Sequence, residues 1–138
     1  MIQSSLICNS FRTELFGGLH DLDSNTLKLA LFDSSWTGSA STTAYSTTNE
    51  ISGTGYTAGG VTLTSVTIYN NGDGHYALTC DPISWTSSTF TFRYALLYNS
   101  SQGNRAIAIY NFGSDVGVSD SLTLTPSQTA PFKMLIGI

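Results

Sequence analysis

The side chains that could do acid–base or nucleophilic chemistry are few, and they lie far apart in the chain. The two histidines are His20, in a short polar segment, and His75, at the exit of a glycine-rich turn. A hydrolytic Ser-His-Asp site would need a strained nucleophile turn such as G-x-S-x-G, and the sequence contains none. The pattern does not place Glu14 and Glu50 together as the carboxylate pair of a glycosidase. We therefore predict that the chain is not an enzyme.

Polar residue spacing predicts neither a metal site nor a cofactor site. Asp21, Asp23 and Asn25 alternate as at the start of a calcium loop, but the glycine and bidentate glutamate of an EF-hand do not follow. The Gly59-Gly60 pair lacks the lysine and the helix that complete a phosphate loop. We expect no bound metal and no cofactor.

Cys8 and Cys80 are too few for a disulfide framework, and their spacing matches no metal-ligand motif. Two buried thiols are the expected state. The first eight residues lack the basic region and the long apolar run of a signal peptide. No apolar run reaches the roughly 18 residues that a membrane-spanning helix needs. We expect a protein that is made in a cytoplasm and stays there unless it travels as part of an assembly, with no membrane partner.

Hydrophobic periodicity predicts an all-β fold with one short N-terminal helix. The helix is expected over residues 9–19, with Ser10 as its cap and Gly17-Gly18 as its end. Alternating residues predict strands over 26–32, 61–68, 75–80, 83–85, 89–98, 105–112, 121–125 and 132–138. We predict a single domain over residues 1–138, built as an antiparallel two-layer β-sandwich or jelly-roll-like fold. The last strand is apolar to its end, so we expect it to be covered or paired.

A Ser/Thr/Gly-rich loop without a regular period occupies residues 33–60. A loop of this length in a small domain usually has a function, so we predict that it contacts a partner. The candidate protein-contact residues are Phe11, in the helix, and Trp36, Tyr45, Asn49, Glu50 and Tyr56, in the loop. Tyrosine supplies contact area at a low entropic cost. The alternative is that the tyrosines attach the loop to its own domain.

The composition narrows the class of partner. Only 10% of the residues are charged and the net charge is −4, which disfavours nucleic acid as a partner. Serine and threonine together supply 39 of the 138 residues. Such a surface relies on hydroxyls instead of ion pairs, and weak self-repulsion favours association. The 16 aromatic residues provide enough apolar volume for a packed core and exclude a disordered chain.

Several segments together carry a resemblance to a known family. They are residues 10–15, the strand 26–32, the segments 92–99 and 109–115, and the loop pattern Y-x-T-x-N-E-x-x-G-x-G-Y-x-x-G-G over residues 45–60. In these segments the chain resembles a family of small structural proteins encoded by tailed bacteriophages, and the resemblance covers nearly the whole sequence. The family brings no catalytic residues to carry over.

The resemblance implies a virion component. The function expected from it is a head decoration or cement protein that binds the major capsid protein, with a tail, baseplate or receptor-binding component as the alternative. Shell symmetry makes a homotrimer the simplest expected stoichiometry. The loop around residues 45–56 and the N-terminal segment are expected to make the contacts. A small hydrolase and a lectin-like domain are the competing classes.

Overall fold

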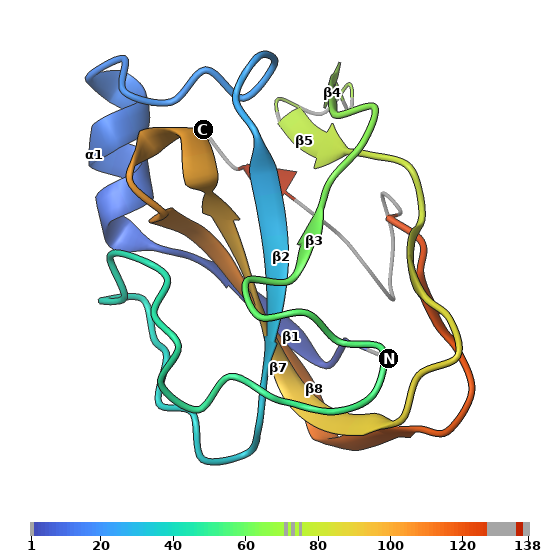
Figure 1. Ribbon diagram of the computed structural model, residues 1–138. Coiled ribbons are helices and arrows are strands. Elements are labelled where there is room, and N and C mark those ends of the chain that lie inside the picture. Colours follow the sequence, from blue (N-terminus) through green and yellow to red (C-terminus); the bar gives the residue numbers. More distant parts are fainter. Residues whose placement is uncertain (1, 71, 73, 75, 127–134, 137–138) are drawn as a thin grey trace.

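The main body of the protein is a five-stranded antiparallel sheet in the order β1-β8-β7-β2-β3 (Figure 1). The computed structural model describes the chain except residues 1, 71, 73, 75, 127–134 and 137–138. In sheet order the strands span Ser4–Ile7, Arg105–Val118, Phe90–Asn99, Leu27–Phe32 and Val61–Thr62. Strand β2 is buried on both faces. Its leucines lie on one face, and Ala30 and Phe32 on the other face are equally buried.

Two smaller antiparallel sheets pack against this body. One is ordered β10-β5-β4, and in the other β6 pairs with β9. Their strands span Leu135–Ile136, Tyr76–Thr79, Thr67–Asn70, Ile83–Trp85 and Leu122–Leu124 in that order. Leu78 of β5 and Trp85 of β6 belong to the same buried cluster as the central strands, so the sheets share one core. The prediction of an all-β antiparallel fold with one short helix is confirmed.

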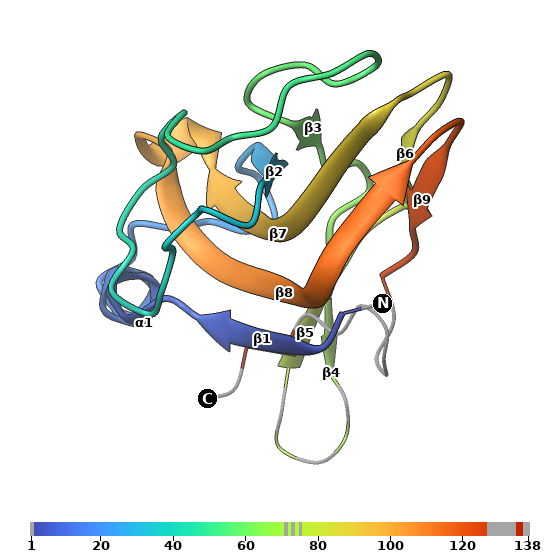
Figure 2. The ribbon, with the colours of Figure 1, turned by 90° about the horizontal axis from the view of Figure 1, so that it is seen from below.

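The long strands β7 and β8 are strongly bent, as Figure 2 shows from below. Their register shifts twice, between Phe92 and Tyr94 and between Leu97 and Tyr98. At both shifts β8 has extra residues relative to β7, which increases the local bend and carries the far ends of the pair toward β6 and β9. Strand β8 continues to Val118, six residues beyond the predicted end.

The helix α1 spans Asn9–Phe16 and is followed by Gly17-Gly18, as predicted. The prediction that Ser10 caps it is wrong, because the N-cap position is Cys8 and no side chain caps the helix there. The Ser10 hydroxyl is buried without a hydrogen-bond partner among the described residues. A 3-10 turn, η1 (Ser100–Gln102), joins β7 to β8. No helix in the described part of the chain is long and apolar enough to cross a bilayer.

Besides the longer β8, the strand predictions differ from the structure at two places. The strand expected over 61–68 is divided into β3 and β4, because Ser65 adopts a left-handed φ of 53° and turns the chain from one sheet into another. Strand β1 was not predicted. Of the strand expected over 132–138, only Leu135–Ile136 lies within the described residues, and it pairs with β5.

Candidate functional site

The long loop returns twice to the outer edge of β2. First Glu50 forms an isolated bridge with Phe32, and the Ile51 amide donates to the Leu31 carbonyl at 3.1 Å. The chain leaves again, turns at Gly59-Gly60 and enters β3, which pairs with the start of β2. The loop therefore lies as an irregular extra strand along a strand whose other edge is paired with β7.

The Glu50 carboxylate holds the loop together from within. It accepts hydrogen bonds from the Tyr45 hydroxyl at 2.6 Å, the Tyr56 hydroxyl at 2.7 Å and the Gly59 amide at 2.7 Å. Bonds to an ionised acceptor are roughly twice as strong as neutral ones. We refer to Tyr45, Glu50, Tyr56, Gly59 and Tyr98 as the tyrosine–carboxylate cluster.

The tyrosine rings fix this cluster to the sheet. Tyr45 stacks on Tyr98 of β7 with ring centroids 4.6 Å apart, and the Tyr98 hydroxyl donates to the Gly59 carbonyl at 2.6 Å. The Leu31 amide donates to the Tyr56 hydroxyl at 2.9 Å, where β2 has no neighbouring strand to accept it. Of the two interpretations left open by the sequence, the contacts of Tyr45 and Tyr56 match attachment of the loop to its own domain.

The three tyrosines of the cluster all have raised pKa values. Burial, followed by the hydrogen bond to Glu50, raises the pKa of Tyr45. Burial is also the main cause of the raised pKa of Tyr56. Burial and the Glu50 charge raise the pKa of Tyr98 to about 12. The hydroxyls therefore remain donors at neutral pH, and the arrangement is suited to structural support.

Stability is expected to fall as pH rises above 10, because the unfolded chain releases tyrosine protons that the folded chain retains. The Tyr98 pKa is raised from 10.0 to about 12, so its contribution is complete below pH 10 and is lost between pH 10 and 12. In that window Tyr98→Phe should reduce the slope of unfolding free energy against pH by about 1.4 kcal/mol per unit. Urea unfolding at stepped pH measures both slopes. Equal slopes in the two proteins would contradict the prediction.

Trp36 is half-buried and packs against aromatic residues of its own domain. It stacks on Phe32 at 4.3 Å between centroids and lies tilted against Tyr94 at 5.8 Å. A Cβ added at Gly38 would overlap the Trp36 ring, so this glycine packs directly on the indole. The remaining part of this half-buried ring lines a hollow beside Asn49.

Phe11 and Asn49 mark the two extremes of exposure among the predicted contact residues. Phe11 has no exposed surface, and its ring packs 4.9 Å from that of His20. This burial corrects the expectation that Phe11 contacts a partner. Asn49 is exposed in a turn and adopts a φ of 61°. A hollow of about 270 Å³ lies beside it, with an uncharged, hydroxyl-rich lining: Trp36, Thr37, Gly38, Thr42, Ala44, Ser46, Thr48 and Asn49.

A second polar network, not predicted from the sequence, surrounds His20. The Ser101 amide donates to Asn99 Oδ1 at 3.0 Å, which fixes the orientation of that buried amide group. Asn99 Nδ2 then faces Asn25 Oδ1 at 2.8 Å and His20 Nδ1 at 3.0 Å. Nδ1 must accept, so His20 carries its proton on Nε2, which lies 3.2 Å from Glu14 Oε1.

This network joins α1 to both ends of the β7–β8 connection. Glu14 also pairs with Arg105 at the start of β8, with Nη1 3.4 Å from Oε2. Asn25 Oδ1 additionally accepts from the Asp21 amide at 3.0 Å, so this side chain stabilises a turn. His20 is 6% exposed, and both of its ring nitrogens have partners.

The other histidine, His75, lies outside the described residues. Within the described residues, no three His, Cys, Asp or Glu side chains group where they could hold a metal ion.

The thiols are protected in different degrees. Cys8 is buried and Cys80 is half-buried, and both are free. Burial raises the pKa of each thiol to about 11.

Comparisons with family models, curated proteins and solved structures give no match to this chain.

Proposed function

We propose that this protein is a non-enzymatic virion structural protein, a decoration or cement protein that binds the outer surface of a bacteriophage head. Its partner in this proposal is the major capsid protein. The resemblance of the loop pattern and the flanking strands to phage structural proteins supplies the context. The geometry of the loop supplies the physical support.

The observation that carries the proposal is that one side of the loop is anchored to the domain while the other side is exposed and uncharged. On the inner side the tyrosine–carboxylate cluster holds the loop against β2 and β7. Away from the cluster, Ser46, Thr47, Thr48 and Asn49 are exposed and uncharged. A surface that is ordered before binding loses little entropy when it docks, and its hydroxyls can hydrogen-bond without desolvating charges.

A tail, baseplate or receptor-binding component is the second candidate. The hydroxyl-rich hollow beside Asn49 favours it, since a receptor glycan would need such groups. Copy number separates the two candidates. A decoration protein is present on the scale of the major capsid protein, and a tail component on the scale of a tail ring. Quantitative mass spectrometry of purified particles measures this ratio.

The loop surface can be tested with substitutions that leave the cluster intact. The double variant Ser46→Lys with Thr48→Lys places two charges on the exposed side, and we expect particle binding to weaken by about tenfold or more. Binding to undecorated heads is measured by co-sedimentation. Deleting residues 42–55 would be less informative, because it would remove Glu50 along with the contact surface.

The double variant Ser119→Lys with Ser121→Lys is the matched control, because both serines are exposed in the segment between β8 and β9, outside the loop. It should bind as the unmodified protein does. Unchanged binding by the loop variant, with its fold intact by circular dichroism, would remove the loop from the contact. Equal loss in the control would assign the effect to charge alone.

A further inference from the structure

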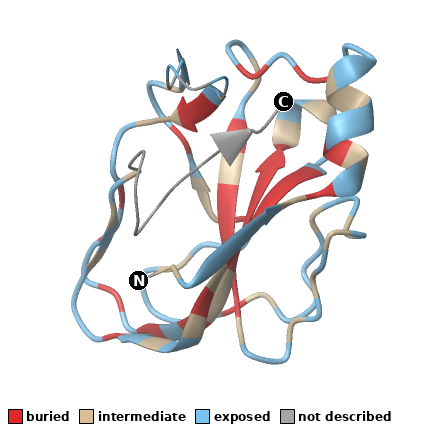
Figure 3. Cartoon of the chain, turned by 180° about the vertical axis from the view of Figure 1, so that it is seen from behind, coloured by how far each residue is buried: buried red, intermediate tan, exposed pale blue. Residues whose placement is uncertain are grey.

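Strand β1 forms an open edge of the five-stranded sheet. It pairs with β8 on one side over Ser4–Ile7, and no described residue pairs with its other side. Figure 3 shows it from behind as an exposed strand crossing in front of the buried centre of the sheet. Open edges of this kind present unpaired backbone donors and acceptors to other chains.

The orientation of the backbone identifies which groups are free. The Cys8 amide donates to the Ile107 carbonyl at 2.9 Å, so the even-numbered residues of β1 face β8. The backbone groups of Ser5 and Ile7 consequently point away from the sheet. The Arg12 guanidinium lies 3.4 Å from the Ile7 carbonyl, as expected for an outward-facing oxygen.

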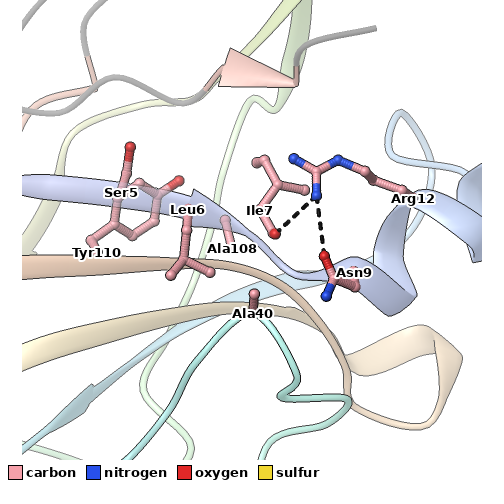
Figure 4. A pocket seen from close by; sticks show the side chains of 8 residues that line it. All are labelled: Ser5, Leu6, Ile7, Asn9, Arg12, Ala40, Ala108 and Tyr110. Carbon is pink, nitrogen blue, oxygen red and sulfur yellow. Dashed lines mark hydrogen bonds between the residues drawn. The ribbon is translucent and has the colours of Figure 1, made fainter.

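The edge has almost none of the features that block pairing. Residues 2–11 contain neither proline nor a charged side chain, and Leu6 is 37% exposed. A hollow of about 460 Å³ runs beside the strand, lined by Ser5, Leu6, Ile7, Asn9, Arg12, Ala40, Ala108 and Tyr110 (Figure 4). Arg12 is the one charged residue in that lining, and it folds toward the helical end of the strand. Ser4 to Leu6 therefore remain accessible to a second strand, and the exposed Ile7 carbonyl, which has two lone pairs, can accept from that strand as well as from Arg12.

We propose that β1 pairs antiparallel with β1 of a second copy of this chain about a twofold axis at Leu6. Ser5 of each copy then lies opposite Ile7 of the other, and their outward backbone groups exchange hydrogen bonds. The two Leu6 side chains meet directly across the axis, which covers the exposed leucine. A strand that pairs with itself generates a twofold, so this contact replaces the threefold expected from shell symmetry.

A second copy fits this edge better than a charged partner, because the strand has no charge to attract one and two uncharged strands approach without repulsion. Among the other edge strands of the described chain, β4 has all four residues exposed, but it is held only by β5 in a small sheet. β1 is held in register by the longest strand of the body. A preformed edge loses less entropy on pairing, which favours β1. The contact concerns the isolated chain and does not depend on the proposed function.

The register is tested by Leu6→Cys in a Cys80→Ser background. Opposed residues of a non-hydrogen-bonded pair have Cα atoms about 4.5 Å apart, within the range that a disulfide spans. Mild oxidation should give a covalent dimer, resolved on a non-reducing gel. Phe16→Cys in the same background is the control, since Phe16 is 78% exposed at the far end of α1, and it should remain uncrosslinked. A dimer that does not crosslink at Leu6, or crosslinks equally at Phe16, would overturn the proposal.

Sedimentation equilibrium tests the contact without new cysteines. Leu6→Lys places two like charges opposite each other and should raise the dimer dissociation constant by about tenfold or more. Ile68→Lys on β4, where Ile68 is 50% exposed, should leave it unchanged. The proposal fails if the unmodified chain is a monomer or a trimer at every concentration, or if Ile68→Lys alone dissociates the dimer. The Leu6→Lys variant is also tested for binding to heads. If it is monomeric and still binds, the dimer contact and the proposed function are independent of each other.

Discussion

Gly60→Ala is expected to lower the free energy of unfolding by more than about 4 kcal/mol, enough to unfold many domains of this size. Gly60 has a φ of 81°, where a side chain is strained, and a Cβ there would overlap the carbonyl group of Leu29. Leu29 cannot retreat, because it is fully buried and its strand is paired with β7 on the other edge. The overlap must be relieved by separating β3 and the loop from β2.

Gly18→Ala separates steric overlap from backbone strain. Gly18 has nearly the same φ, 80°, but a Cβ there would meet no atom within 4 Å. Its substitution should cost about 1 kcal/mol. Chemical denaturation followed by circular dichroism measures both variants. Similar losses in the two proteins would show that the close approach of Gly60 to Leu29 does not limit the fold.

Glu50→Ala is expected to cost about 3 kcal/mol and to free the loop from the sheet. It removes one acceptor from three donors, the Tyr45 and Tyr56 hydroxyls and the Gly59 amide. Each buried donor left unpaired costs about 1–3 kcal/mol, and access of water through the partly exposed site reduces the sum. The stability loss is measured by urea unfolding, and loop release by limited proteolysis between β2 and β3.

Tyr45→Phe is the matched comparison for Glu50→Ala. It removes one hydroxyl but keeps the ring that stacks on Tyr98, so it should cost only about 1 kcal/mol. The prediction for Glu50 would be contradicted if its variant stayed within this smaller loss and resisted protease as the unmodified protein does. In that case stacking, and not the carboxylate, would hold the loop.

Strands whose own residues alternate between apolar and polar could be predicted from the sequence, whereas strands fixed by pairing with a distant segment could not. Strand β7 was predicted to within a residue because Phe90 and Phe92 alternate with threonines facing out of the core. Strand β1 was missed because Ser4-Ser5-Leu6-Ile7 has no alternation, and its structure is imposed by pairing with β8. Turn chemistry likewise did not reveal the left-handed Ser65 that divides β3 from β4.

The candidate site was harder to predict because its contacts are not periodic. Tyr45 and Tyr56 lie five and six residues from Glu50 in an irregular loop, so no helix or strand period relates them. The sequence could single out these residues without deciding between a partner and their own domain. His20 and Asn99 are separated by 79 positions, and the pairing of β2 with β7 brings Asn99 to its place beside His20.

Because Glu50 secures the loop from its inner side, folding and the proposed recognition depend on different residues of the same segment. Ser46, Thr47 and Thr48 are exposed between Tyr45 and Asn49, and their side chains take no part in the cluster. This stretch can exchange its sequence while the anchors on either side stay fixed. The loop thereby resembles the variable tip of a binding scaffold, on which new specificities, or an inserted epitope for display, can be carried without rebuilding the domain.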